Sequence, residues 1–186
     1  MVGVVTVSST FEISTMQRTQ AHRYVLFNCP QEFKDHLRMR YGERRISNTE
    51  IERSDNKDFI NWFSQRVHIS STVSSDLKYL SQGPTSHARR FPAFNVNGFK
   101  FRTESRAHGK NQNIREEDLA YYRKLEDIIE LNYYGRFKVT LFKCKWADTT
   151  RDKGFRKHPW GFTFVNFSRL IHIGDREKHD PYIKAS

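Results

Sequence analysis

The chain has 186 residues, 37% hydrophobic and 14% aromatic, which is enough for one folded domain with a modest core. Its two cysteines, Cys29 and Cys144, exclude a disulfide framework and a cysteine-rich zinc site. The formal net charge is +11, and residues 133–169 alone carry nine basic and two acidic residues. Such a segment is either a solvated basic face or a surface for a phosphate-bearing or acidic partner.

The N-terminal half is expected to be mostly helical after an arm or loose strand over residues 1–20. The apolar run 22–28 predicts a strand or a buried connection. Three helices are expected over 29–41, 54–67 and 74–84, because their apolar residues recur at helical spacing. Helix-capping residues support these predictions: Pro30, Ser54 or Asp55, and Ser74 or Ser75, with Gly83 and Pro84 closing the third helix.

The half from about residue 91 onward is expected to be β-structure. Asn97-Gly98, between alternating apolar residues, predicts a two-residue hairpin turn. The aromatic-rich stretch 161–173 predicts another strand.

The stretch 121–148 fits a helix or a strand in its first part and a strand in its second. We favour two strands joined by a loop at Tyr134-Gly135. The alternation of apolar residues changes phase at Leu141–Phe142, which predicts a β-bulge there. This phase turns Cys144 and Trp146 inward and leaves the lysines beside them outside.

These elements predict an α+β protein: a helical segment followed by a small, mostly antiparallel, barrel-like β domain. The expected division is an arm over 1–20, a mostly helical segment over 21–90 and a β-rich domain over 91–186. The rhythm of 121–146 is similar to that of SH3-like or BAH-type chromatin-reader barrels, at the level of fold alone.

Carboxylates in the same stretch raise the alternative of a metal-dependent nuclease, which needs two or three of them around Mg²⁺. The candidates are Glu126, Asp127, Glu130 and Asp148. On a regular strand Glu126 and Glu130 share one face and Asp127 lies on the other, so they do not converge. No histidine pair has the spacing of a metal site and there is no glycine-rich phosphate loop, so we expect no cofactor, no metal and no small-molecule substrate.

Basic and aromatic residues alternate in "FKVTLFKCKW" and "RDKGFRKHPWGF". Nucleic-acid binding uses this combination, since cations follow the backbone and exposed rings stack on bases. Trp160, in a loop flanked by Pro and Gly, is the ring expected to be exposed. The predicted nucleic-acid-binding residues are Arg136, Lys138, Lys143, Lys145, Arg151, Lys153, Arg156, Lys157 and Trp160.

Eight short phrases occur in an order that resembles a known family. They are "AHRYVLFNC", "DFINWFSQRV", "LSQGP", "FNVNGFKFRT", "YYRKLEDIIELNY", "VTLFKCKWAD", "GFTFVNFSRLIH" and "DPYIKAS". The chain resembles, from about residue 20 to its end, the carboxy-terminal region of plant CACTA-type (En/Spm) transposon proteins, including their transposase-associated domain of unknown function, DUF4216.

The resemblance implies a transposon-derived module that follows a transposase core and inherits no catalytic residue from it. The function expected is a non-catalytic accessory or interaction module, with DNA, chromatin or other transposon proteins as partners. The alternatives are the nuclease-like enzyme and a non-functional remnant of a transposable element. No signal peptide or membrane span is evident, so a soluble intracellular protein, with the nucleus as one location, is expected.

Overall fold

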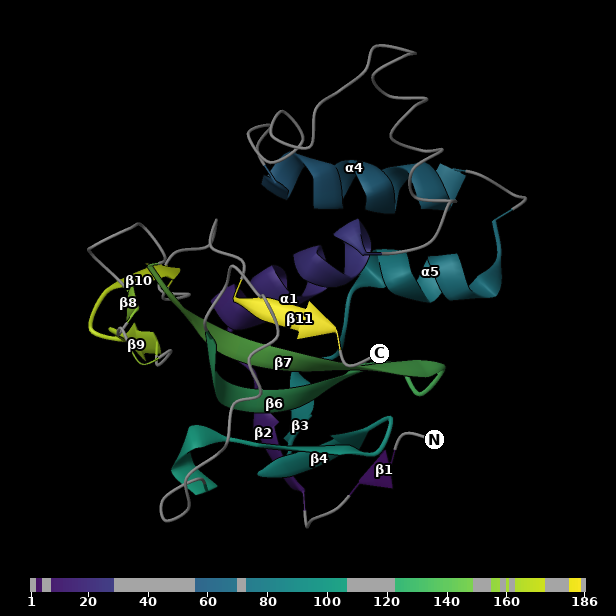
Figure 1. Ribbon diagram of the computed structural model, residues 1–186. Helices are drawn as coiled ribbons and strands as arrows, with labels where there is room; N and C mark the ends of the chain where they lie inside the picture. Colours follow the sequence, from purple (N-terminus) through teal and green to yellow (C-terminus); the bar gives the residue numbers. More distant parts are fainter. Residues whose placement is uncertain are drawn as a thin grey trace.

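The computed structural model describes residues 3–4, 8–28, 56–69, 73–106, 123–148, 155–157, 160, 163–172 and 181–184. Figure 1 shows three layers: helices above, a six-stranded sheet in the middle and a three-stranded sheet below. The helices are α1 (Thr15–Phe27), α4 (Asn56–Ile69) and α5 (Ser75–Gln82), with a 3₁₀ turn η1 at Glu104–Arg106.

Every pairing between the described strands is antiparallel. The large sheet has the order β10-β7-β6-β3-β2, with β11 on the same edge of β7 as β10; the small sheet is β1-β4-β5, and β8 pairs with β9. The strands are β1 (Gly3–Val4), β2 (Ser9–Glu12), β3 (His87–Arg90), β4 (Ala93–Val96), β5 (Phe99–Arg102), β6 (Arg123–Tyr133), β7 (Phe137–Ala147), β8 (Phe155–Lys157), β9 (Thr163–Val165), β10 (Leu170–His172) and β11 (Tyr182–Lys184).

The α+β class with antiparallel sheets is confirmed, but the predicted barrel is wrong for the described strands. β2 lies at one edge of the large sheet and β10 and β11 at the other, and these edges do not pair. The sheet is covered instead of closed: helices pack on one face and the small sheet on the other (Figure 1).

Helix α1 was not predicted from the sequence. Residues 22–28 were expected to be a strand or connection, and they form the second half of a helix that begins within the predicted arm. Ser14 caps its start, accepting a hydrogen bond from the Gln17 N–H at 3.3 Å. The polar residues His22 and Arg23 in this half of the helix are buried. The sequence therefore lacks the pattern of one apolar and one polar face that identifies an amphipathic helix.

The helices predicted over 54–67 and 74–84 are confirmed. In α4, Phe63 and Val67 lie four residues apart and are both buried. Ser74 caps α5 by accepting the Leu77 N–H at 3.4 Å, and the helix ends at Gly83. The helix expected over 29–41 and the capping residues of α4 lie outside the described residues.

Two hairpins form where they were predicted. Asn97 and Gly98 have φ of 49° and 85°, the positive values that a type I′ turn needs, and they join β4 to β5. Tyr134 and Gly135 are likewise positive, at 54° and 77°, and join β6 to β7. Stretch 121–148 is thus a strand pair in its described part, from residue 123, whereas the strand expected over 161–173 is divided into β9 and β10.

The β-bulge was predicted in the wrong strand. The register between β6 and β7 shifts between Leu125 and Asp127, so the extra residue is Glu126 in β6, and β7 itself alternates regularly. The phase change at Leu141–Phe142 has another cause: Leu141 is buried on the helix side and Phe142 on the side of the small sheet. A strand covered on both faces buries two neighbours in succession.

Two buried clusters lie on the two faces of the large sheet. The cluster on the helix side runs from Ile13 to Tyr182 in sequence and therefore joins residues from both sides of the boundary expected at residue 90. The cluster against the small sheet contains Phe91, Phe94, Val96, Ile128, Phe142 and Cys144. The large sheet thus contributes side chains to both cores, and these side chains are held by packing on both faces of the sheet.

Candidate nucleic-acid interface

The acidic and basic halves of the β6–β7 hairpin pair with each other across the sheet. Glu126 in the bulge of β6 lies 3.0 Å from Lys143 Nζ and 3.5 Å from Lys145 Nζ. The Lys143 side chain is only 15% exposed. Because one carboxylate holds both ammonium groups, neither lysine stands as an isolated cation ready for a phosphate.

A second set of ion pairs lies on the opposite face of the hairpin. Glu130 lies 3.6 Å from Lys138 Nζ and 3.5 Å from the Arg89 guanidinium. The bulge explains why Glu126 and Glu130 do not share a face, as a regular strand predicted. Asp127 accepts hydrogen bonds from Arg90 Nε at 2.8 and 3.0 Å and so bonds to β3.

The predicted basic surface is therefore not continuous along β7. Arg136 lies in the β6–β7 turn and donates to Asp76 of α5 at 2.7 Å, a hydrogen bond that raises the pKa of the guanidinium. It lies nine positions before Lys145 along an extended chain, a separation of about 30 Å. Lys138 projects to the face opposite Lys143 and Lys145.

The remaining predicted residues lie beyond β7. Arg151 and Lys153 fall outside the described residues. Arg156 and Lys157 are in β8, where they stand opposite Phe164 and Thr163 of β9. Trp160, in the turn of this hairpin, is 81% exposed, as its place between Pro and Gly predicted.

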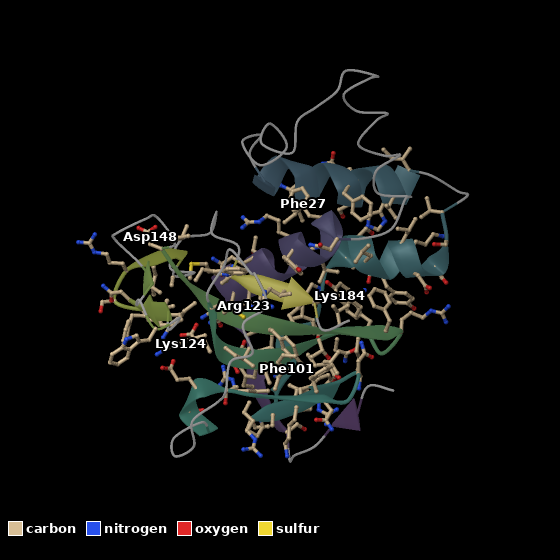
Figure 2. The ribbon with its side chains drawn as sticks, viewed as in Figure 1. Phe27, Phe101, Arg123, Lys124, Asp148 and Lys184 are labelled. Atoms are coloured by element: carbon tan, nitrogen blue, oxygen red, sulfur yellow. The ribbon has the colours of Figure 1, made fainter. Side chains whose placement is uncertain are left out.

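Further aromatic and basic side chains gather near this hairpin, and the sequence reasoning missed them. Phe164 is 61% exposed. At the adjoining end of β6, the Arg123 guanidinium lies 5.5 Å from the ring centre of Trp146, and Lys124 Nζ lies 4.7 Å from that of Phe167. Figure 1 places β8 and β9 beside β10, beyond this end of the large sheet, and Figure 2 shows Lys124 on that side of the molecule.

We call this region the aromatic–basic end. It comprises Arg123, Lys124, Trp146, Phe167, Arg169 and the β8–β9 hairpin with Trp160 and Phe164. Its signal in the sequence is the continued mixing of rings and cations through "FVNFSR", 164–169, which an aromatic-rich core strand also explains.

The carboxylates of the nuclease alternative do not converge. Glu126, Asp127 and Glu130 are held by different cations, and the backbone N–H of Asp148 donates to the Arg169 carbonyl at 3.0 Å. Across the described part of the chain, no three His, Cys, Asp or Glu side chains are grouped so that they could hold a metal ion.

Cys144 is not arranged as a nucleophile. It points into the cluster between the large and small sheets, as its alternation predicted, and it is buried. Burial raises the pKa of its thiol to about 11, so the reactive thiolate is disfavoured at neutral pH.

The pairing of Glu126 with two lysines gives a stability prediction. Glu126→Gln is expected to lower the free energy of unfolding by about 1–2 kcal/mol, because it leaves the largely buried Lys143 without its counter-charge. Urea denaturation measures the change. Glu104→Gln, whose pair with Lys124 is exposed on both sides, is the matched control and should cost less than about 0.5 kcal/mol. Equal losses in the two variants would contradict a special role for the bulge carboxylate.

Among the described helices, none is long and apolar enough to cross a membrane.

No curated protein and no solved structure matched the chain. Residues 129–186, which include β7 and the aromatic–basic end from Trp146 onward, match the family model described as Domain of unknown function (DUF4216). Over these residues the chain is similar to the DUF4216 family, which supports the predicted resemblance for this part of the chain; the match does not extend to residues 20–128.

Proposed function

We propose that the chain is a non-catalytic nucleic-acid-binding module that contacts its ligand through the aromatic–basic end. The observation that carries the proposal is the exposure of two large rings, Trp160 and Phe164, on one hairpin. Rings exposed to this extent contribute little to a core, whereas the faces of unpaired bases stack on them favourably. The ligand favoured is therefore single-stranded DNA, or DNA opened locally.

Charge supports the same surface. Arg156 is the cross-strand partner of Phe164, so a basic position and an exposed ring stand directly opposite each other on β8 and β9. The lysines of β7 are held by Glu126 and Glu130, which makes them a weaker choice for phosphate contact. The proposal thus moves the binding surface from the β6–β7 turn and the lysines of β7 to the aromatic–basic end.

The family relation is compatible with a binding role and assigns no reaction. The matched domain is one of unknown function, and the motif order resembles the carboxy-terminal region of plant CACTA-type transposon proteins. We propose on this basis an accessory module of transposon origin that acts on DNA or chromatin, in the nucleus, beside other transposon proteins. The analogy with SH3-like and BAH-type readers is not part of this proposal, because the described strands form no closed barrel.

Binding of fluorescent oligo(dT) and of a duplex of the same length tests the proposal. Trp160→Ala and Phe164→Ala are each expected to weaken oligo(dT) binding about 10- to 100-fold, since each ring removed loses one stacked base. Phe99→Ala is the matched control, because Phe99 is 71% exposed but belongs to β5, and it should leave binding unchanged. Affinity should fall steeply between about 50 and 200 mM salt.

Three results would contradict the proposal. Equal binding by the Trp160, Phe164 and Phe99 variants would show that the aromatic–basic end is not the site. Cleavage of the oligonucleotide with added Mg²⁺, lost in Asp127→Asn, would favour the nuclease instead of a binding module. Absence of binding at low salt by the unaltered protein would exclude nucleic acid as the ligand.

A further inference from the structure

The outer edge of the small sheet has features that the proposed nucleic-acid surface does not use. In the order β1-β4-β5, strand β5 is an end strand, and within the part of the chain that the structure describes it pairs with β4 alone. All four of its residues, Phe99 to Arg102, are exposed. An edge strand with free backbone groups is a template for a further strand.

The register shows which backbone groups face outward. In an antiparallel pair, residues that exchange hydrogen bonds alternate with residues that do not. The Thr103 N–H donates to the Pro92 carbonyl at 3.1 Å, and counting back along the pairs places Phe101 and Phe99 in the bonded class. Lys100 and Arg102 fall in the other class, so their N–H and C=O groups point to the open edge.

The side chains of β5 divide in the same way between two faces. Phe101 packs toward the large sheet, with its ring centre 5.0 Å from that of Phe142 (Figure 2), and Phe99 follows on the same face. Lys100 and Arg102 project from the opposite face, and neither forms an ion pair with a described residue. The edge therefore offers four backbone groups, one largely exposed ring and two cations that no described residue pairs with.

We propose that β5 binds an extended acidic peptide as an added antiparallel strand. Its acidic residues would stand opposite Lys100 and Arg102, where opposite charges on facing positions stabilise a strand pair, and an apolar residue between them would cover Phe99 and Phe101. A second copy of this chain is disfavoured as the occupant, because two β5 edges would set like charges opposite each other. The motif recognised is acidic–apolar–acidic.

A charge-swap experiment with the full chain tests this peptide site. The probe is a fluorescent peptide with Glu at two alternate positions, Val between them and Thr at the flanks. The Lys100→Glu/Arg102→Glu variant is expected to lose about tenfold in affinity, and a matching peptide with Lys in place of Glu should bind this variant better than it binds the unaltered protein. Lys78→Glu, which reverses an exposed charge on α5, should leave binding of the Glu peptide unchanged.

Amide hydrogen exchange distinguishes strand pairing from a purely electrostatic contact, because only new backbone hydrogen bonds protect individual amides. On peptide binding, the amides of Lys100 and Arg102 should gain protection, while those of Phe99 and Phe101, already directed at β4, should not. Equal affinity for both peptides in the charge-reversed variant would overturn the proposal. Protection of the Lys100 and Arg102 amides in the free protein that increases with protein concentration would also overturn it, because this indicates self-association. Protection of these amides by oligo(dT) but not by the peptide would overturn it as well, because this indicates a nucleic acid at this edge.

Discussion

Leu141→Ala is expected to lower the free energy of unfolding by about 3 kcal/mol or more, and Phe142→Ala by a similar amount. The two residues are neighbours in β7, and alternation places them on opposite faces of the sheet. Leu141 is fully buried in the cluster on the helix side, and Phe142 is 8% exposed in the cluster against the small sheet. Each truncation therefore removes apolar contacts and leaves a cavity in a different core.

This pair of losses distinguishes a strand covered on both faces from a strand with one solvated face. In the second case one of two neighbours would tolerate alanine, at a cost below about 0.5 kcal/mol. Lys138→Ala, at an exposed position of the same strand, is the control and should fall in that range. Urea denaturation with a shared m-value measures all three variants. A tolerated Phe142→Ala would mean that the small sheet does not pack on β7 in solution.

Local chemistry accounts for the parts of this fold that the sequence predicted. Asn97-Gly98 and Tyr134-Gly135 mark two turns because positive φ restricts the residues that can occupy them. Ser74 and Gly83 mark the ends of α5 for a similar local reason. Such signals depend on a few neighbouring residues, so they can be read without knowing what packs against them.

The features that the sequence did not predict depend on long-range contacts. Helix α1 was missed because the sheet and α5 bury its polar residue His22, which removes the amphipathic pattern. The bulge was assigned to β7 because its apolar residues change phase at Leu141–Phe142. A bulged strand and a strand covered on both faces give the same sequence pattern. The cover on the second face of β7 is the small sheet, whose strands β4 and β5 lie about forty residues earlier in the chain and β1 near its start.

The candidate site was predictable only in part, for the same reason. The exposure of Trp160 followed from its neighbours in the loop. The ion pairs that engage Lys138, Lys143 and Lys145 did not, because charge segregated along the sequence becomes charge paired across two strands only when the register is known. When an acidic stretch and a basic stretch are joined by a tight turn, the pattern predicts two strands with paired opposite charges and not a free basic surface.

His22 is the titratable group most strongly changed by folding among the described residues. Its ring is buried between α1 and β6, with Nδ1 3.1 Å from the Tyr133 hydroxyl. The Nε2 edge lies against Gly83 and has no hydrogen-bond partner in the described part of the chain. Burial, with a smaller contribution from the nearby positive charge of Arg18, lowers the pKa of His22 from 6.5 to about 4. A neutral imidazole is thus required by the packing of α1 on the sheet.

Acidification from neutral pH to pH 4 is expected to remove about 3 kcal/mol of stability through His22 alone. Because the folded-state pKa is the lower one, the unfolded chain binds more protons between pH 6.5 and 4, so the free energy of unfolding falls as the pH falls through that window. Above pH 6.5 this contribution is fully present, and below pH 4 it is lost. Urea denaturation at several pH values should show the slope in the unaltered protein and a reduced slope in His22→Gln, whose side chain does not titrate. An equal slope in the two proteins would assign the acid sensitivity to other groups.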